Sequence, residues 1–349
     1  MINYKCMRFD ENILEVLDQR ILPFKEEWIG LKTCKEVEIA IADMTVRGAG
    51  VIGCVGAIGA YYAVKEANGD SKKLEELSVS LKNARPTAVN LEYAVNRVLK
   101  SAKTDTKKAY EEAVKINRED AEASELIGAN GLKEIKKILK KTGKKSINIM
   151  THCNAGYLAI IDKGSALAPI YAAKEAGIDV HVWVDETRPR NQGANLTAWE
   201  LGKSGVKHTL VADNMGALLM QRGMVDMMIV GADRVAANGD TANKIGTHLK
   251  ALAAKAHDVP FYVALPSSTF DFGIKNGVKE IHIEERSSDE LLYMYGLDEN
   301  KEVKKIRVAP EWTGGLNLGF DITPSKLITK LITERGAFAP KKIGEFYKA

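Results

Sequence analysis

Between residues 146 and 266, short apolar runs alternate regularly with amphipathic stretches, which leaves few folds open to the chain. The apolar runs are short and rich in β-branched residues, which is typical of strands, whereas the stretches between them have helical spacing. The predicted strands are 146–153, 179–186, 207–213, 224–233 and 260–266, and the predicted helices are 164–177, 193–205, 214–223 and 242–258. Strands joined by helices in this way predict a parallel, doubly wound sheet with right-handed crossovers.

The N-terminal third of the chain lacks this alternation. A Gly/Ala-rich segment at 46–67 is bracketed by charged amphipathic helices, and a few short strands are expected before it. Residues 108–140 have helical spacing and many charges, so we interpret them as a helical connector. We therefore predict an α/β protein with a small, mostly helical N-terminal domain at 1–125 and a Rossmann-like catalytic domain at 126–349. A cleft between two domains is the default place for a site.

Charge and composition exclude several classes of protein. The net charge of +4 arises from 50 basic and 46 acidic residues spread along the chain, whereas nucleic-acid binding normally needs a clustered basic face. No apolar run approaches the ~20 residues that span a bilayer, and the N-terminus lacks a signal-peptide core. We therefore expect a cytoplasmic protein with no membrane contact.

Metal and nucleotide motifs are missing from the sequence as well. The four cysteines form no CxxC pair and the six histidines form no HExxH motif, so we expect free thiols and no metal. Neither a Walker A motif nor a GxGxxG turn is present, so nucleotide binding has no support. No cofactor is expected.

Polar groups follow all five predicted strands. In open α/β sheets, ligands bind beyond the carboxyl ends of the strands, so these groups are expected to share one site. The segments concerned are 151–154, 185–188, 213–214, 231–234 and 266–269.

Two strand ends carry reactive groups. Cys153 ends an apolar strand before a predicted tight turn, where its thiol can serve as base or nucleophile; a small buried hydrophobe is an equally common role for cysteine. Asp233 follows a run apolar enough to be a buried strand, where desolvation would raise its pKa and keep it protonated. Its alternative roles are a helix N-cap or an ion pair with Arg234.

Other polar residues are candidates for substrate binding. Arg47, with Gly48 and Ala49, resembles an anion clamp with close backbone approach, although a tightly packed small-residue helix is the alternative. Lys244 near a predicted helix start can hold a phosphate or be a solvated helix residue. His152 is expected to point to the opposite face of its strand from Cys153.

The segment after the second predicted strand is densely charged. Residues 185–190 are either a salt-bridged loop or part of the site, and surface ion pairs are more often structural. Gln192 and Asn195, just beyond, are candidate partners for sugar hydroxyls.

Six motifs together resemble the methylthioribose-1-phosphate isomerase family, within a group that also holds ribose-1,5-bisphosphate isomerases and the regulatory subunits of initiation factor 2B. They are VRGAG, ARPTAVNL, THCNAG, DETRPRNQGANLTAWEL, VGADRVAANGDTANKIGT and FDITPSKLITKLITERG, spread from about residue 40 to about residue 336. The resemblance implies a catalytic cysteine at Cys153 and a catalytic acid at Asp233. It implies substrate contacts at Arg47, Gly48, Ala49, Arg85, Gln192, Asn243 and Lys244.

The resemblance also implies a function. It predicts a homodimeric aldose–ketose isomerase that converts 5-methylthioribose 1-phosphate to 5-methylthioribulose 1-phosphate in methionine salvage. Two motifs depart from the family pattern, because RGAGVIG and THCNAG stand where the family usually has RGAP and THCNTG. The group at C5 of the sugar therefore stays open, with 5-deoxyribose 1-phosphate and ribose 1,5-bisphosphate as alternatives. A non-catalytic regulatory subunit is the alternative of another class, but such subunits typically lack the Cys/Asp pair.

Overall fold

The computed structural model describes residues 1–85 and 89–347. Residues 86–88, inside the motif ARPTAVNL, lie outside the described residues. The larger part of the molecule is built on a sheet with the strand order β17-β16-β11-β8-β5-β6-β7, in which β16 and β17 are antiparallel and the other neighbours are parallel. Its strands in chain order are Ser146–Thr151 (β5), Asp179–Asp185 (β6), Lys207–Val211 (β7), Met227–Val230 (β8), Phe261–Ala264 (β11), Lys330–Thr333 (β16) and Gly336–Phe338 (β17).

The parallel strands, numbered along the chain, are arranged 3-2-1-4-5-6 across the sheet. This is the order of Rossmann-type folds, in which the chain direction across the sheet reverses between the first and fourth strands. Here these strands are β5 and β8, which pair directly. The predicted doubly wound parallel sheet is therefore confirmed.

Both faces of the sheet are covered, which explains why its strands are continuously apolar. Alternate residues of β5 enter different cores: Ile149 belongs to the core that includes α5 and α6, whereas Met150 belongs to the core that includes α8 and α9. The covering helices are Thr106–Thr142 (α5), Ala168–Glu175 (α6), Ala198–Lys203 (α7), Gly216–Gln221 (α8) and Thr247–Ala256 (α9).

The N-terminal part is a helical bundle with a small antiparallel sheet at its start. The strands are Ile2–Asn3 (β1), Met7–Phe9 (β2), Leu14–Leu17 (β3) and Trp28–Leu31 (β4), and the helices are Cys34–Ala42 (α1), Ala49–Ala67 (α2), Ser71–Asn83 (α3) and Val89–Ala102 (α4). The Gly/Ala-rich segment forms α2, which is buried along nearly its whole length. Small residues let α4 approach closely, since a Cβ on Gly56 would lie 2.4 Å from Leu91. The alternative given above for Arg47, Gly48 and Ala49, that the segment begins a tightly packed helix of small residues, is confirmed.

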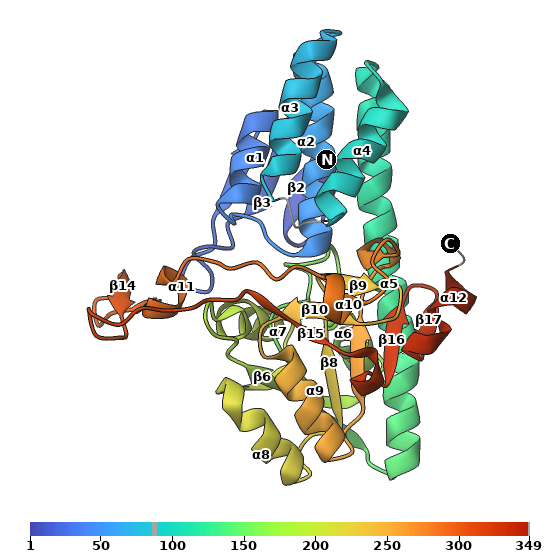
Figure 1. Cartoon of the computed structure of the whole chain (residues 1–349), viewed down its shortest axis with the longest axis vertical. Coiled ribbons are helices and arrows are strands. Elements are labelled where there is room, and N and C mark those ends of the chain that lie inside the picture. Colours follow the sequence, from blue (N-terminus) through green and yellow to red (C-terminus); the bar gives the residue numbers. More distant parts are fainter. Residues whose placement is uncertain (86–88, 348–349) are drawn as a thin grey trace.

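The predicted connector is part of α5, which extends from the bundle down one side of the sheet (Figure 1). The predicted boundary between residues 125 and 126 lies inside this helix. The division of the chain into two domains at that point stays a prediction.

One predicted helix is wrong over its first part. Residues Thr241–Lys244, expected to begin the helix at 242–258, form strand β10, and α9 begins only at Thr247. The reason is non-local, because β10 pairs antiparallel with Arg234–Ala236 (β9) and Phe320–Thr323 (β15). This second sheet has the order β12-β9-β10-β15, with β12 at Phe270–Asp271, and lies between the helical bundle and the large sheet (Figure 1). It carries Asn243 and Lys244 toward the centre of the molecule.

The remaining elements lie after residue 270. A hairpin of Tyr293–Leu297 (β13) and Val303–Arg307 (β14) projects from the body of the molecule (Figure 1). The short helices are Gly277–Glu280 (α10), Asp289–Leu292 (α11) and Ile343–Phe346 (α12). Among the helices of the described ranges, none combines the length and apolar character that crossing a membrane requires.

Candidate active site

The two reactive residues singled out in the sequence lie on either side of the point where the strand order reverses. Cys153 follows β5 and Asp233 follows β8. Carboxyl ends of strands diverge at such a point and leave a crevice in which ligands of α/β proteins bind. Both residues line one cavity there.

Of the strand-end segments expected to share one site, 185–188, 213–214 and 266–269 do not line this cavity. The cavity does bring together nine residues predicted to act in catalysis or substrate binding. They are Arg47, Gly48, Ala49, Arg85, Cys153, Gln192, Asp233, Asn243 and Lys244. They come from the helical bundle, the large sheet and the second sheet. Asn154, from the predicted strand-end segment 151–154, also lines the cavity, whereas other lining residues were not singled out in the sequence, among them Met44, Ser165 and Phe320. The sequence gives no strong signal for them, because single polar or apolar residues in loops are common.

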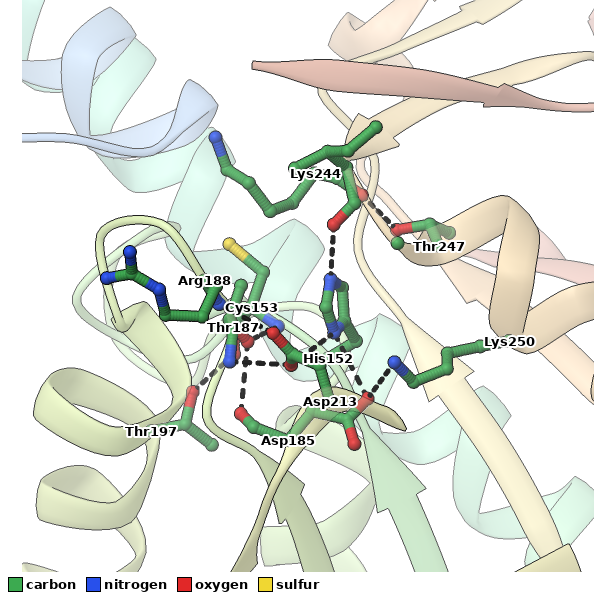
Figure 2. Close-up of polar contacts among 12 residues, drawn as sticks. His152, Cys153, Asp185, Thr187, Arg188, Thr197, Asp213, Lys244, Thr247 and Lys250 are labelled. Atoms are coloured by element: carbon green, nitrogen blue, oxygen red, sulfur yellow. Dashed lines mark hydrogen bonds and ion pairs between the residues drawn. The ribbon is translucent and has the colours of Figure 1, made fainter. Parts of the chain in front are cut away.

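Cys153 has a left-handed backbone conformation, with φ of 65°. A cysteine rarely adopts this conformation, so its surroundings must hold it there. Two threonines do so: the Cys153 N–H donates to Thr187 Oγ1 at 2.8 Å, and Thr197 Oγ1 donates to the Cys153 carbonyl at 2.6 Å. The resulting bend points the sulfur toward the Lys244 side of the cavity (Figure 2). The first α-helix after Cys153 is α6, which starts at Ala168. The thiol therefore does not lie at the N-terminus of a helix that directly follows it.

His152 points away from Cys153, as predicted, and enters a buried charged network (Figure 2). Its Nδ1 lies 3.1 Å from Asp185 Oδ2 and its Nε2 lies 2.8 Å from the Ile245 carbonyl oxygen. Lys250 Nζ lies 3.2 Å from the same Asp185 oxygen. His152, Asp185 and Asp213 are close enough to share a metal ion, but both ring nitrogens of His152 and the Oδ2 atom of Asp185 already have partners in these contacts. We interpret the network as support for the strand ends beneath the cavity.

The charged loop after β6 is also mainly structural. Asp213 accepts hydrogen bonds from the backbone N–H groups of Thr187 and Arg188 at 2.8 and 2.7 Å. Arg190 forms an ion pair with Glu290 at 2.8 Å. Of the two sugar-binding candidates beyond this loop, Gln192 lines the cavity, whereas Asn195 lines a neighbouring one.

Asp233 lies in a buried environment beside three cationic side chains. It precedes strand β9 rather than a helix, so the N-cap alternative is wrong, and Arg234 pairs with Asp271 at 3.5 Å. Burial raises the pKa of Asp233, while the positive charges of Lys244 and two arginines oppose the rise. Binding of an anion by these cations would weaken their opposition and raise the pKa of Asp233 further.

Three cations lie around the pair: Arg47, Arg85 and Lys244. Lys244 is buried, donates to the Gly319 carbonyl at 3.0 Å and lies over the Phe320 ring, so the solvated-helix alternative is wrong. Burial lowers the pKa of Lys244 and that of Arg85. Buried cations of this kind are expected where an anionic ligand supplies the missing charge.

Two residues of the cavity lining, Gln192 and Ser165, carry polar atoms without a partner in the part of the chain that the structure describes. Gln192 Oε1 and Ser165 Oγ are buried, and neither has a hydrogen-bond partner among the described residues. A bound hydroxyl would satisfy such an atom at little cost. Asn243 Nδ2 donates to Thr247 Oγ1 at 3.0 Å.

The backbone at the start of α2, at Gly48 and Ala49, forms another part of the cavity lining. Gly48 has φ of 89°, and a Cβ at this position would lie 2.4 Å from the Ala159 backbone. Glycine therefore allows the helix N-terminus to approach the loop after Cys153. Helix N-termini favour anions, since their first N–H groups have no partner inside the helix.

Comparison with known proteins gives a consistent result. The profile of the Initiation factor 2 subunit family matches residues 27–340. The chain is 56% identical over 341 residues to a methylthioribose-1-phosphate isomerase from Sulfurimonas denitrificans, which covers 96% of this chain and 95% of the relative. It is 52% identical over 336 residues to one from Desulfatibacillum aliphaticivorans, with coverage of 94% and 91%.

Solved structures agree with these relatives. The 5-methylthioribose 1-phosphate isomerase of Pyrococcus horikoshii superposes with a TM-score of 0.83 at 36% identity, covering 97% of this chain and 94% of that one. A structure described as translation initiation factor eIF-2B subunit delta from A. fulgidus has a TM-score of 0.82 at 36% identity and covers 99% of both chains.

Proposed function

Because the chain belongs to the methylthioribose-1-phosphate isomerases of the Initiation factor 2 subunit family and is an aldose–ketose isomerase, we propose that its substrate is 5-methylthioribose 1-phosphate and its product 5-methylthioribulose 1-phosphate. One observation carries the proposal. A thiol and a carboxyl with a raised pKa line the same cavity at the strand reversal, beside three cations. An acid, a second proton-transfer group and a phosphate clamp are what isomerisation of a sugar 1-phosphate requires.

The first step opens the sugar ring. The anomeric carbon of a sugar 1-phosphate is locked in a cyclic acetal, so no free aldehyde is available. Asp233 in its protonated form donates to the ring oxygen, and the bond between C1 and that oxygen breaks. Arg47, Arg85 and Lys244 hold the phosphate, so that its negative charge is matched while the ring opens.

The second step moves hydrogen from C2 to C1. In one route, the Cys153 thiolate removes the C2 proton to form an enediol phosphate and returns a proton to C1, while the 2-hydroxyl proton returns to Asp233. In the other route, a hydride passes directly from C2 to C1 and the Cys153 thiolate takes the 2-hydroxyl proton. A proton then passes from Cys153 to the Asp233 carboxylate, which restores both groups. Both routes leave an open-chain ketose with the phosphate still on C1. Gln192 Oε1 and Ser165 Oγ are available to orient the sugar hydroxyls.

An apolar extension of the cavity supports the methylthio group at C5. A pocket that shares Arg85 and Asp233 with the site continues between the helical bundle and the segment after α10. Its apolar walls are formed by Ile52, Val89, Ala242, Ile281, Ile283 and Phe320, and its polar lining also includes Asn90, Arg234, His282 and Glu284. Burial of a thioether methyl group against such walls is favourable, whereas a second phosphate there would lose its hydration.

A substrate panel tests this assignment. We expect kcat/KM to be highest for 5-methylthioribose 1-phosphate and about tenfold lower for 5-deoxyribose 1-phosphate, which lacks the buried thioether. Ribose 1,5-bisphosphate should be a far poorer substrate, since its second phosphate would be desolvated. Product formation by purified protein, followed chromatographically, measures all three. Preference for the bisphosphate would contradict the thioether assignment, and lack of turnover of every sugar in the panel would favour a regulatory role.

We also propose that the protein is a homodimer. Exposed apolar side chains gather on the β13–β14 hairpin and the segment after it, a pattern that marks interaction surfaces. They are Tyr295, Leu297, Val303, Ile306, Trp312 and Leu316. Sedimentation equilibrium should give twice the 38.2 kDa of the chain. A mass equal to one chain at micromolar concentration would rule this out.

A further inference from the structure

We propose that Glu200 is a positioning residue that acts through Asn154 to hold the Arg47 guanidinium in the cavity. The inference rests on the proposed function, because Arg47 is taken there to bind the substrate phosphate. Glu200 does not line the cavity, so it contacts neither the substrate nor the reacting atoms.

Glu200 lies on α7 with its side chain completely buried beneath the loop that follows Cys153. Its two carboxylate oxygens accept four hydrogen bonds. The donors are Asn154 Nδ2 at 2.8 Å, the Tyr157 N–H at 2.8 Å, the Leu158 N–H at 3.0 Å and the Tyr171 hydroxyl at 3.1 Å. Four bonds use the acceptor capacity of a carboxylate, so Glu200 fixes the course of the loop.

The loop is shaped around this carboxylate. A Cβ on Gly156 would lie 1.9 Å from Glu200 Oε2, so only glycine allows the backbone to pass so closely. Burial raises the pKa of Glu200, and the hydrogen bonds from Asn154 and the loop oppose the rise. A buried carboxyl is costly in free energy unless its oxygens are hydrogen-bonded, and the four donors to Glu200 offset that cost.

Glu200 also orients the Asn154 amide, whose Nδ2 donates to Glu200 Oε1 at 2.8 Å and to Thr197 Oγ1 at 3.3 Å. A carboxylate only accepts hydrogen bonds, so the NH₂ group of Asn154 must point toward it and the amide oxygen must point away. That oxygen then accepts from Arg47 Nη1 at 2.6 Å, and the Asn154 backbone carbonyl accepts from Arg47 Nη2 at 3.2 Å. Asn154 thus accepts hydrogen bonds from both terminal nitrogens of the Arg47 guanidinium. The other N–H donors of Arg47 remain available for an anion.

These hydrogen bonds connect the Glu200 carboxylate to the Arg47 guanidinium through Asn154. Glu200 orients Asn154, and Asn154 orients Arg47, with every link shorter than 3.3 Å. Without the amide, Arg47 keeps its charge but loses its fixed direction. Affinity for the phosphate is therefore expected to fall while the reacting pair, Cys153 and Asp233, stays in place.

Asn154→Ala tests the inference because it removes the middle link and leaves the Glu200 bonds to the loop backbone. We expect KM for 5-methylthioribose 1-phosphate to rise about tenfold, the value of one charge-assisted hydrogen bond, with kcat changed by less than about threefold. In an Arg47→Ala background, Asn154→Ala should raise KM no further, since its effect passes through the arginine. Glu200→Gln should raise KM to a similar degree and also lower Tm.

Calorimetric titration with inorganic phosphate gives a second readout that needs no turnover, and it should show the same tenfold weakening in Asn154→Ala. Asn117→Ala is the matched control, because Asn117 is equally buried but bonds only to backbone carbonyls of α2 and α5, away from the cavity. It should lower Tm without moving KM.

Three results would overturn the positioning role: phosphate binding within twofold of wild type in Asn154→Ala, independent effects of the Arg47 and Asn154 substitutions, or a KM increase as large in Asn117→Ala. The proposed function fails separately, if wild-type protein does not turn over the sugar. The phosphate titration then still decides whether Glu200 and Asn154 position Arg47.

Discussion

Asp233→Asn is expected to lower kcat by about three orders of magnitude while KM and Tm stay near their wild-type values. The amide has nearly the shape of the carboxyl group but has no acidic proton, so it cannot protonate the ring oxygen as the C1–oxygen bond breaks. A general acid typically contributes a factor of about 10²–10⁴ to the rate. Kinetics of the purified variant with 5-methylthioribose 1-phosphate measure the effect.

The pH profile gives an independent view of the same group. In the proposed mechanism the acid form of Asp233 is the active one, so wild-type kcat/KM should fall as the pH rises through the pKa of this carboxyl. Burial raises that pKa above its ordinary value, so the fall should begin at a higher pH than for an exposed aspartate. The residual activity of Asp233→Asn should lack this alkaline decline.

Asp271→Asn is the matched control. Asp271 lies close to the site and forms an ion pair with Arg234 at 3.5 Å, but it does not line the cavity. Its loss should leave kcat within about twofold, since surface and half-buried ion pairs contribute little. Near-normal turnover by Asp233→Asn, or an equal loss in both variants, would show that Asp233 is not the acid.

Much of the large sheet could be predicted because its information is local. Each strand is a short apolar run between amphipathic helices, so element type follows from neighbours within a few residues. The position of Cys153 and Asp233 at strand ends followed from the same pattern. That both residues flank the strand reversal needed the strand order, which is set by packing between segments more than 70 residues apart.

The parts that could not be predicted depend on distant partners. Residues 241–244 have a helix-like pattern but form β10, since β9 and β15 provide partners on both sides. The left-handed conformation of Cys153 depends on two threonines that lie more than 30 residues beyond it. Glu200 looks like a solvated residue of an amphipathic helix and is in fact completely buried.

The resemblance added residues that pattern reasoning alone did not single out. Arg85 and Asn243 were named only because the family motifs align there, and both line the cavity. Arginine and asparagine are common on protein surfaces, so residue type alone does not mark Arg85 and Asn243 as site residues. Their position in the cavity lining depends on the fold.

Cys153→Ser is the second substitution with a large expected effect, and it should lower kcat by about three orders of magnitude. A serine hydroxyl has almost the same size as the thiol, so the bend held by Thr187 and Thr197 should persist and KM should change little. At neutral pH, however, a hydroxyl is far less able than a thiol to give up its proton and accept another. Cys34→Ala is the matched control, because it removes an equally buried thiol from the helical bundle and should keep full activity.

Isotope labelling then shows which hydrogen Cys153 moves. With substrate deuterated at C2, a direct hydride shift keeps all deuterium in the product, whereas proton abstraction by the thiolate lets deuterium exchange with water. Under the enediol route, Cys153→Ser should lose exchange and turnover together; under the hydride route, it should lose turnover with no exchange in either protein. The sulfur is held in a buried, bent loop on the Lys244 side of the cavity (Figure 2), and under both proposed routes the thiol is needed for turnover. If Cys153→Ser turned over substrate at the wild-type rate, the thiol would have no part in the mechanism, and the bend at Cys153 would have a structural role only.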